Sequence, residues 1–232
     1  MTSNNQRTAL AFAAVLAFMP VAAEATIARA VKFDEKVDKA AAIVVGKVVS
    51  QQSAWDAKHE RILTYSKFQI EQTLKGVPAQ EITIVTPGGT VGDIAQDYVG
   101  VPRFNAGGEH VVFVKNTAAG PTVLYFDQGA YKVEKDSRGD RIVTPLVTSA
   151  VLVDSQRGAA VAPESPRSLR DFQGSIRESV RRREAVRMEM IEQKKREEAS
   201  LWNQIKRNKL LVTIALLGVM LATWQLVKRS SS

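Results

Sequence analysis

Residues 41–49 read AAIVVGKVV, a stretch that is rich in β-branched residues and almost free of polar side chains. Such a short apolar run predicts a buried β-strand. Gly46 interrupts the run, and a glycine inside a strand indicates a bulge or a bend. We therefore place this strand at the centre of a β-rich domain.

Further strand patterns follow at short intervals. Residues 62–74 alternate between apolar and polar side chains, which predicts a long strand with one buried face. Many short strands separated by Gly and Pro turns are typical of a small barrel or a sandwich. We expect a mainly β domain over residues 26–158, with a short helix at 32–39 and later strands at 81–86, 110–115, 122–126, 130–135 and 141–144.

The N-terminus has the pattern of a secretory signal peptide. A polar region with Arg7 precedes an apolar stretch from Ala9, and small residues follow up to Ala25. The stretch is short for a membrane span of ~20 residues, which favours cleavage over an uncleaved anchor. We expect residues 1–25 to be removed, and cleavage after Ala30 is the alternative.

A second apolar block, residues 210–227, contains 18 residues without a charge. A helix of this length covers ~27 Å, which predicts a transmembrane helix. The short basic tail, residues 228–232, follows it. Because an export signal fixes orientation first, we expect a cytoplasmic C-terminus, although the basic flank before the helix favours the opposite orientation. Processing of the tail to release the domain stays open.

A long charged helix is predicted between the β domain and this block. Residues 159–167 form a linker of small residues and proline, and Ser168 to Asp171 has the spacing of a helix N-cap. Residues 168–209 lack proline and contain favourable i,i+4 ion pairs, which predicts a stalk helix. Apolar residues near heptad spacing leave a homodimer through residues 168–209 open, but Lys195 and Glu198 interrupt the heptad.

The net charge of +8 is concentrated on this stalk. Residues 26–164 carry 16 basic and 16 acidic side chains, whereas residues 165–209 carry 13 basic and 7 acidic ones, a net charge of +6. Because the excess lies beside the predicted membrane segment, attraction to anionic lipid headgroups explains it, and we expect no nucleic-acid partner.

The composition excludes several kinds of chemistry. The chain has no cysteine, which removes disulfides, thiol catalysis and thiolate metal sites. The only histidines, His59 and His110, belong to no metal-binding motif, and no nucleophile elbow is present. We therefore expect no catalytic residue, no metal and no cofactor.

Aromatic residues in predicted loops are the remaining candidates for a binding surface. Tyr98, Arg103 and Phe104 lie in the segment 88–108, which carries few strand signals, and Trp55 flanks a charged loop. Loops of this length in compact domains are often functional. We take these four residues as candidate partner-binding residues, and the alternative is that the aromatics cap the core.

The segment from Ala41 to Phe113 resembles the netrin-like or TIMP-like modules. The resemblance rests on residues 43–48, on Leu74-Lys75-Gly76 and on residues 104–113, which include Gly108-Glu109. The segment is also similar to secreted bacterial proteins with a Pro-Arg-Phe and then a Gly-Glu stretch, here Pro102-Arg103-Phe104 and Gly108-Glu109. The resemblance implies a five-stranded OB-like barrel that binds proteins. Inhibition in the TIMP family uses an N-terminal cysteine and disulfides, so it does not carry over to this chain.

Together these observations predict a protein of a bacterial inner membrane with a single span and a periplasmic or extracellular main domain. We expect a non-enzymatic protein-interaction module that contacts the membrane and unknown envelope proteins. The alternative is an envelope protease inhibitor or hydrolase that acts through the loop at 88–108.

Overall fold

The computed structural model describes residues 27–146 and 151–230, with the backbone alone at residues 205, 207, 210–212 and 225–230. The predicted signal peptide and the last two residues of the predicted tail lie outside the described residues. The chain divides into two compact units, Met1–Gly174 and Ser175–Ser232. The first unit is built mainly of strands, and the second is helical.

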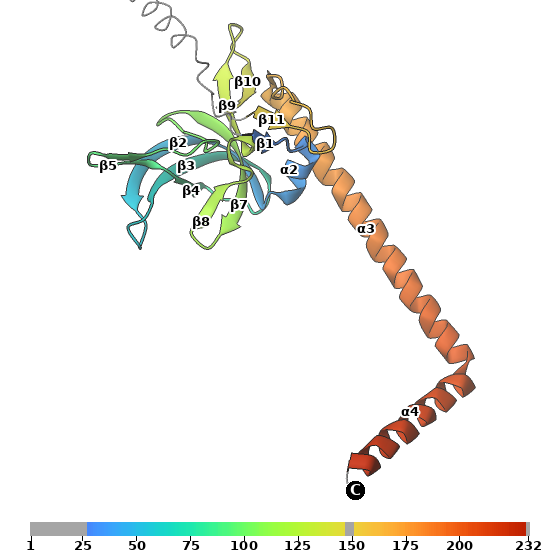
Figure 1. Cartoon of the computed structure of the whole chain (residues 1–232). Coiled ribbons are helices and arrows are strands. Elements are labelled where there is room, and N and C mark those ends of the chain that lie inside the picture. The colour runs from blue at the N-terminus through green and yellow to red at the C-terminus, as the bar shows by residue number, and fades with distance from the viewer. Residues whose placement is uncertain (1–26, 147–150, 231–232) are drawn as a thin grey trace, which may run out of the picture. The chain divides into compact units, whose positions relative to one another are not determined.

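The elements follow one another along the chain as shown in Figure 1. They are β1 (Ile27–Arg29), α2 (Phe33–Lys39), β2 (Ala42–Trp55), β3 (Ile62–Lys75), β4 (Glu81–Pro87), β5 (Gly89–Val91), β6 (Ile94–Gln96), β7 (Glu109–Thr117), β8 (Gly120–Val123), the 3₁₀ turn η1 (Phe126–Gly129), β9 (Ala130–Lys135), β10 (Arg141–Pro145), β11 (Val151–Val153), β12 (Arg167–Ser168), α3 (Leu169–Arg207) and α4 (Lys209–Ser230).

The main sheet is curved but open. Its strands are paired in the order β12-β10-β9-β7-β2-β3-β4, and β8 pairs with β7 outside this path. Strands β4 and β8 approach each other, yet no ladder joins them among the described residues. Pro87 in β4 and Pro121 in β8 have no N–H to donate, which fits an unpaired seam. The described residues therefore form a β-rich domain whose main sheet does not close into a barrel.

The central strand β2 has buried side chains on both faces of the sheet. Val44 and Val48 belong to one core cluster, together with Phe68 of β3 and Val112 of β7. Ile43 and Val45 point to the other face and are also inaccessible to solvent. Burial on both faces explains the unbroken apolar run. At Gly46 the register with β3 shifts, as the glycine predicted, and an added Cβ would lie 2.6 Å from the Gln69 carbonyl oxygen.

A second core on the opposite face is aromatic. Phe33 of α2 and Phe172 of α3 lie with their ring centroids 5.4 Å apart, and Tyr131 of β9 lies 4.7 Å from Phe172. Phe113 of β7 completes the cluster, at 5.7 Å from Tyr131. The beginning of α3 therefore packs in the same compact unit as the sheet.

The structure confirms most of the predicted strands but changes three segments. Residues 88–96, predicted as a loop, contain the hairpin β5–β6, whose turn includes Gly92 at a φ of 58°. The strand predicted at 122–126 ends at Val123, because Tyr125 and Phe126 both have a φ of 56° and begin a 3₁₀ turn. Strand β1, which no pattern predicted, pairs in parallel with β11.

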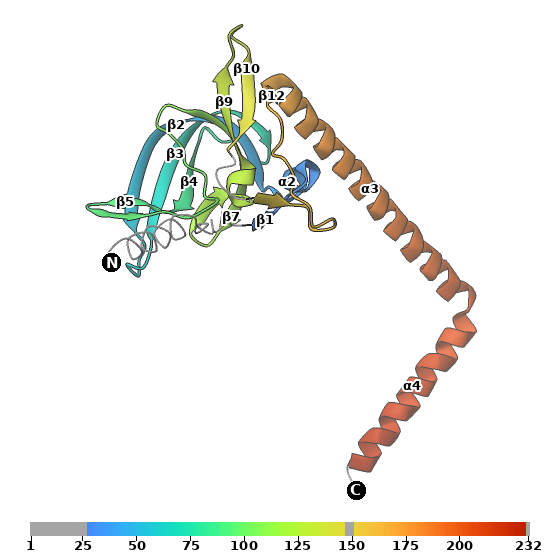
Figure 2. The same ribbon diagram turned by 45° about the horizontal axis from the view of Figure 1, so that its top comes forward.

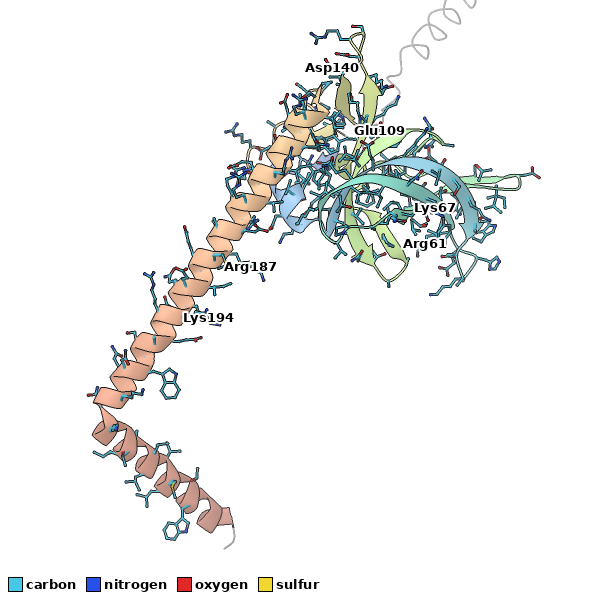
Figure 3. The ribbon with its side chains drawn as sticks, turned by 180° about the vertical axis from the view of Figure 1, so that it is seen from behind. Arg61, Lys67, Glu109, Asp140, Arg187 and Lys194 are labelled. Carbon is cyan, nitrogen blue, oxygen red and sulfur yellow. The ribbon has the colours of Figure 1, made fainter. Side chains whose placement is uncertain are left out.

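The second unit contains most of α3 and all of α4. Its charges form exposed pairs within α3, such as Glu178 with Arg182 at 4.0 Å and Glu192 with Arg196 at 3.7 Å. Such exposed pairs stabilise a helix only slightly. The side chains of Arg187 and Lys194 project from the α3 ribbon in Figure 3. Over the described part of the chain, no helix combines the length and the apolar character that a membrane span requires.

Candidate functional site

A polar pocket of about 350 Å³ is lined by residues of β3 and β4, of the hairpin β5–β6 and of the segment 101–105. Alternate residues of β3 lead into it, because Thr64 and Ser66 line the pocket and Phe68, two residues further on, lies in the core. Strand β4 behaves in the same way, with Thr86 at the pocket and Ile84 in the core. The pocket is therefore a polar continuation of the apolar interior.

The hairpin β5–β6 forms one wall of the pocket and lies beside the far ends of β2 and β3 (Figure 2). Hydrogen bonds attach it to β3. The Gly88 N–H donates to the Ile62 carbonyl oxygen at 2.8 Å, and the Ile62 N–H donates to Gln96 Oε1 at 2.7 Å. The Thr64 hydroxyl donates to the Gly88 carbonyl oxygen at 2.7 Å. The wall is thus held in place by hydrogen bonds within the chain.

Gly89 allows this close approach. Its φ is +129°, a conformation that L side chains rarely adopt, and an added Cβ would lie 2.4 Å from both Ser53 Oγ and Thr64 Oγ1. Any other residue would push the hairpin away from β2 and β3. The glycine-rich segment at 88–92 therefore serves hairpin packing in this structure.

The described lining of the pocket contains two charged side chains, and they neutralise each other. Arg103 forms an ion pair with Asp97, and both side chains are about 70% exposed at the rim. The hydrogen bond from Arg103 lowers the pKa of Asp97. The other polar lining comes from neutral hydroxyl and amide side chains, namely Gln51, Thr64, Ser66, Thr86, Thr90, Gln96 and Asn105.

The four residues proposed from the sequence lie in different environments. Arg103 and Phe104 line the pocket, but Phe104 is only 5% exposed and packs edge-on to Phe68 with centroids 5.0 Å apart. It therefore caps the core from the pocket side. Tyr98 is exposed just after the hairpin, with its hydroxyl 3.4 Å from Gln96 Oε1. Trp55 ends β2 instead of lying in a loop, and it stacks on His59 outside the pocket lining.

Sequence reasoning missed Phe126, which is 61% exposed. It lines a smaller pocket of about 60 Å³ together with Val101, Pro102 and Val123. Two consecutive non-glycine residues at positive φ cost free energy, so this turn is strained. The pattern of residues 122–126 predicted a strand. Gly129 was the residue that could have indicated the turn, because an added Cβ there would lie 1.9 Å from the Leu124 carbonyl oxygen.

His110 lies beneath Phe104 in the core. It is 3% exposed, and its ring centroid is 5.0 Å from that of Phe104 and 6.1 Å from that of Phe68. Neither ring nitrogen has a hydrogen-bond partner among the described residues. Burial lowers the pKa of His110 to about 4, so the ring is neutral at pH 7.

Lys36 forms a separate polar cluster beside the aromatic core. Its ammonium donates to the Tyr131 hydroxyl and to Glu164 Oε1, each at 2.5 Å, and to the Gln128 carbonyl oxygen at 3.2 Å. Burial lowers the pKa of Lys36, although Glu164 opposes the shift. Glu164 belongs to the segment predicted as a linker, which this ion pair attaches to α2 and the Tyr131 hydroxyl attaches to β9.

The described residues contain no group of three or more His, Cys, Asp or Glu side chains that could bind a metal ion. The polar pocket, its attached hairpin and the exposed apolar residues beside it are the features available for recognition. In comparisons with known proteins, no family model, no curated protein and no solved structure matches this chain.

Proposed function

We propose that this chain is a membrane-anchored, extracytoplasmic protein-interaction module of a bacterial envelope complex. The observation that carries the proposal is the surface around the hairpin β5–β6, where large apolar side chains are exposed on a wall attached by hydrogen bonds. Exposed apolar residues can mark sites of protein contact. They are Ile94 of β6, Tyr98 and Val99 in the loop that follows it, and Phe126, which lines the smaller pocket.

The segments around this surface are connected to one another. The Asp127 N–H donates to the Gly100 carbonyl oxygen at 2.8 Å, which ties the turn that carries Phe126 to the loop that carries Tyr98 and Val99. A surface that is ordered before binding loses little conformational entropy on binding. This favours recognition of a folded partner or of a short segment of one.

The anchoring part of the proposal rests on the sequence. The uncharged block at residues 210–227 is the proposed membrane span, and the proposed signal peptide at residues 1–25 directs export. The basic stalk then lies near anionic headgroups. For the fold, we propose an OB-like barrel that is left open between β4 and β8, as the proximity of these two strands supports.

Affinity purification of the full chain from solubilised membranes tests the interaction. We expect stoichiometric partner proteins with the wild type, and their loss with the double substitution Tyr98→Ser and Phe126→Ser. The matched control is Val77→Ser, because Val77 is 85% exposed and lies in the β3–β4 turn. Recovery of the chain alone, or equal recovery of partners with all variants, would overturn the proposal.

The alternative, an inhibitor or hydrolase that acts through residues 88–108, gains support only from the pocket itself. The hydroxyl groups there have no histidine or unpaired carboxylate among the described lining residues to activate them. We therefore favour binding over catalysis as the function of this surface.

A further inference from the structure

The polar pocket contains buried hydroxyl and amide groups that have hydrogen-bonding capacity to spare. Thr86 lines the pocket and is 5% exposed, and its hydroxyl can both donate and accept. Gln51 also lines the pocket, and its Nε2 donates to the hydroxyl of the fully buried Ser66 at 2.9 Å, which holds a carboxamide with a second N–H and a carbonyl oxygen at the pocket. A hydrogen bond to a group with little access to water is stronger than one at an exposed surface, so a ligand that pairs with Thr86 gains affinity.

The charge of the pocket limits the class of ligand. Its two described charged side chains, Asp97 and Arg103, already pair with each other at the rim. An anionic or a cationic ligand would have to displace one of them or bury its own charge unpaired, which is unfavourable. Hydroxyl and carboxamide groups, in contrast, supply both donors and acceptors to a neutral partner.

Part of the pocket lining is apolar. Val101, Pro102 and Phe104 line the pocket together with the polar groups. A sugar ring has hydroxyl groups that donate and accept and C–H groups that pack on apolar surface, so it matches both kinds of lining. A volume of about 350 Å³ is at the lower end of the range for small-molecule sites, ~300–1,000 Å³.

From this geometry we infer that the pocket beneath the hairpin β5–β6 binds a neutral saccharide, with Thr86 and Gln51 as hydrogen-bonding groups and the buried Ser66 as the positioning residue that holds the Gln51 carboxamide. This inference goes beyond the proposed protein interaction, which uses the exposed residues outside the pocket. A protein segment in the pocket is the competing occupant, and the experiment below distinguishes the two.

Isothermal titration calorimetry on the full chain tests the inference, in a zwitterionic detergent that carries no sugar. The probes are two neutral trisaccharides, maltotriose and the trimer of N-acetylglucosamine, and two charged ones, the trimers of glucosamine and galacturonic acid. We expect a neutral probe to bind at millimolar concentration or below and both charged probes to bind more weakly. Thr86→Val and Ser66→Ala should each weaken binding of the neutral probe by about fivefold to tenfold.

Thr73→Val is the matched control, because Thr73 lies on the same strand as Ser66 but outside the pocket lining. It should bind the neutral probe as the wild type does. Failure of both neutral probes to bind, equal binding of the charged probes, or unchanged affinity in Thr86→Val and Ser66→Ala would overturn the inference. If these variants lose the co-purified partner while no saccharide binds, the pocket accepts a protein segment, and the proposed function stands without this inference.

Discussion

The buried histidine in the core makes the stability of the sheet domain depend on pH. The pKa of His110 is about 4 in the folded chain, against 6.5 for the unperturbed side chain. The Tyr131 backbone opposes this lowering of the pKa, whereas the charge of Lys132, opposite His110 on β9, adds a smaller effect in the same direction as burial. Between these two pKa values the unfolded chain binds more protons than the folded chain. The free energy of unfolding is therefore highest above pH 6.5 and falls as the pH falls toward 4.

The size of the effect follows from the same two values. Lowering the pH from 7 to 5 should reduce the free energy of unfolding by about 2 kcal/mol through His110 alone. The variant His110→Leu keeps an apolar side chain beside Phe68 and Phe104 but removes the titrating group. It should lose about 2 kcal/mol less than the wild type over the same pH range.

Urea unfolding at pH 7 and at pH 5 measures this difference. The chain has three tryptophans, so replacing Trp202 and Trp224 by Phe leaves Trp55 of β2 to report on the sheet. His59→Asn is the control, because His59 is exposed at a positive φ that asparagine tolerates. If His110→Leu and the wild type lose the same free energy between the two pH values, the reasoning about burial is refuted.

Three further substitutions or truncations test other parts of the structure. Gly89→Ala should destabilise the sheet domain by about 1–3 kcal/mol in the same urea assay. Gly92→Ala should cost less, because Gly92 is also at positive φ but has open space around it. Equal costs of the two substitutions would contradict the packing of β5 on β3. Lys36→Met should cost about 1–3 kcal/mol, because it removes the buried ammonium and leaves the Glu164 carboxylate with the Tyr131 hydroxyl and Arg167. Adding Glu164→Gln should recover part of this cost, and additive losses in this double-mutant cycle would argue against a coupled cluster. A chain that ends at Asn208 should move from the membrane fraction to the soluble fraction. Its retention in the membrane fraction would refute residues 210–227 as the anchor.

The sequence predicted the elements whose burial is a local pattern. The apolar run at 41–49 and the alternation at 62–74 indicate strands without knowledge of their partners, because the period of two is a property of the strand itself. The N-cap at Ser168 was equally local, and its hydroxyl accepts a hydrogen bond from the Asp171 N–H at 3.1 Å. These predictions are confirmed.

Features that depend on contacts between distant segments could not be predicted in this way. Residues 89–96 have little strand character, and their hairpin packs on β2 and β3 through glycines and single hydrogen bonds. Strand β1 pairs with a segment more than a hundred residues away. Whether β4 and β8 close the sheet depends on curvature, which the strand patterns do not encode. For the candidate site, the sequence indicated the segment 88–108, parts of which line the pocket, but the hydroxyl groups of Ser66 and Thr86 lie in strands whose pattern predicted only a core role.

The position of the pocket follows from the unequal lengths of its strands. Strands β2 and β3 pair as far as Trp55 and Ile62, well past the core residues Val48 and Phe68, and their outer halves carry neutral polar side chains. Apolar side chains in these outer halves would need another layer of the chain to cover them. Because the chain has no disulfides, burial alone would have to stabilise that layer. The polar extension is instead covered by a hairpin that hydrogen bonds hold. Substitutions such as Thr86→Val should therefore alter the proposed recognition while the apolar core around Phe104 keeps the fold, so that binding can be tested independently of stability.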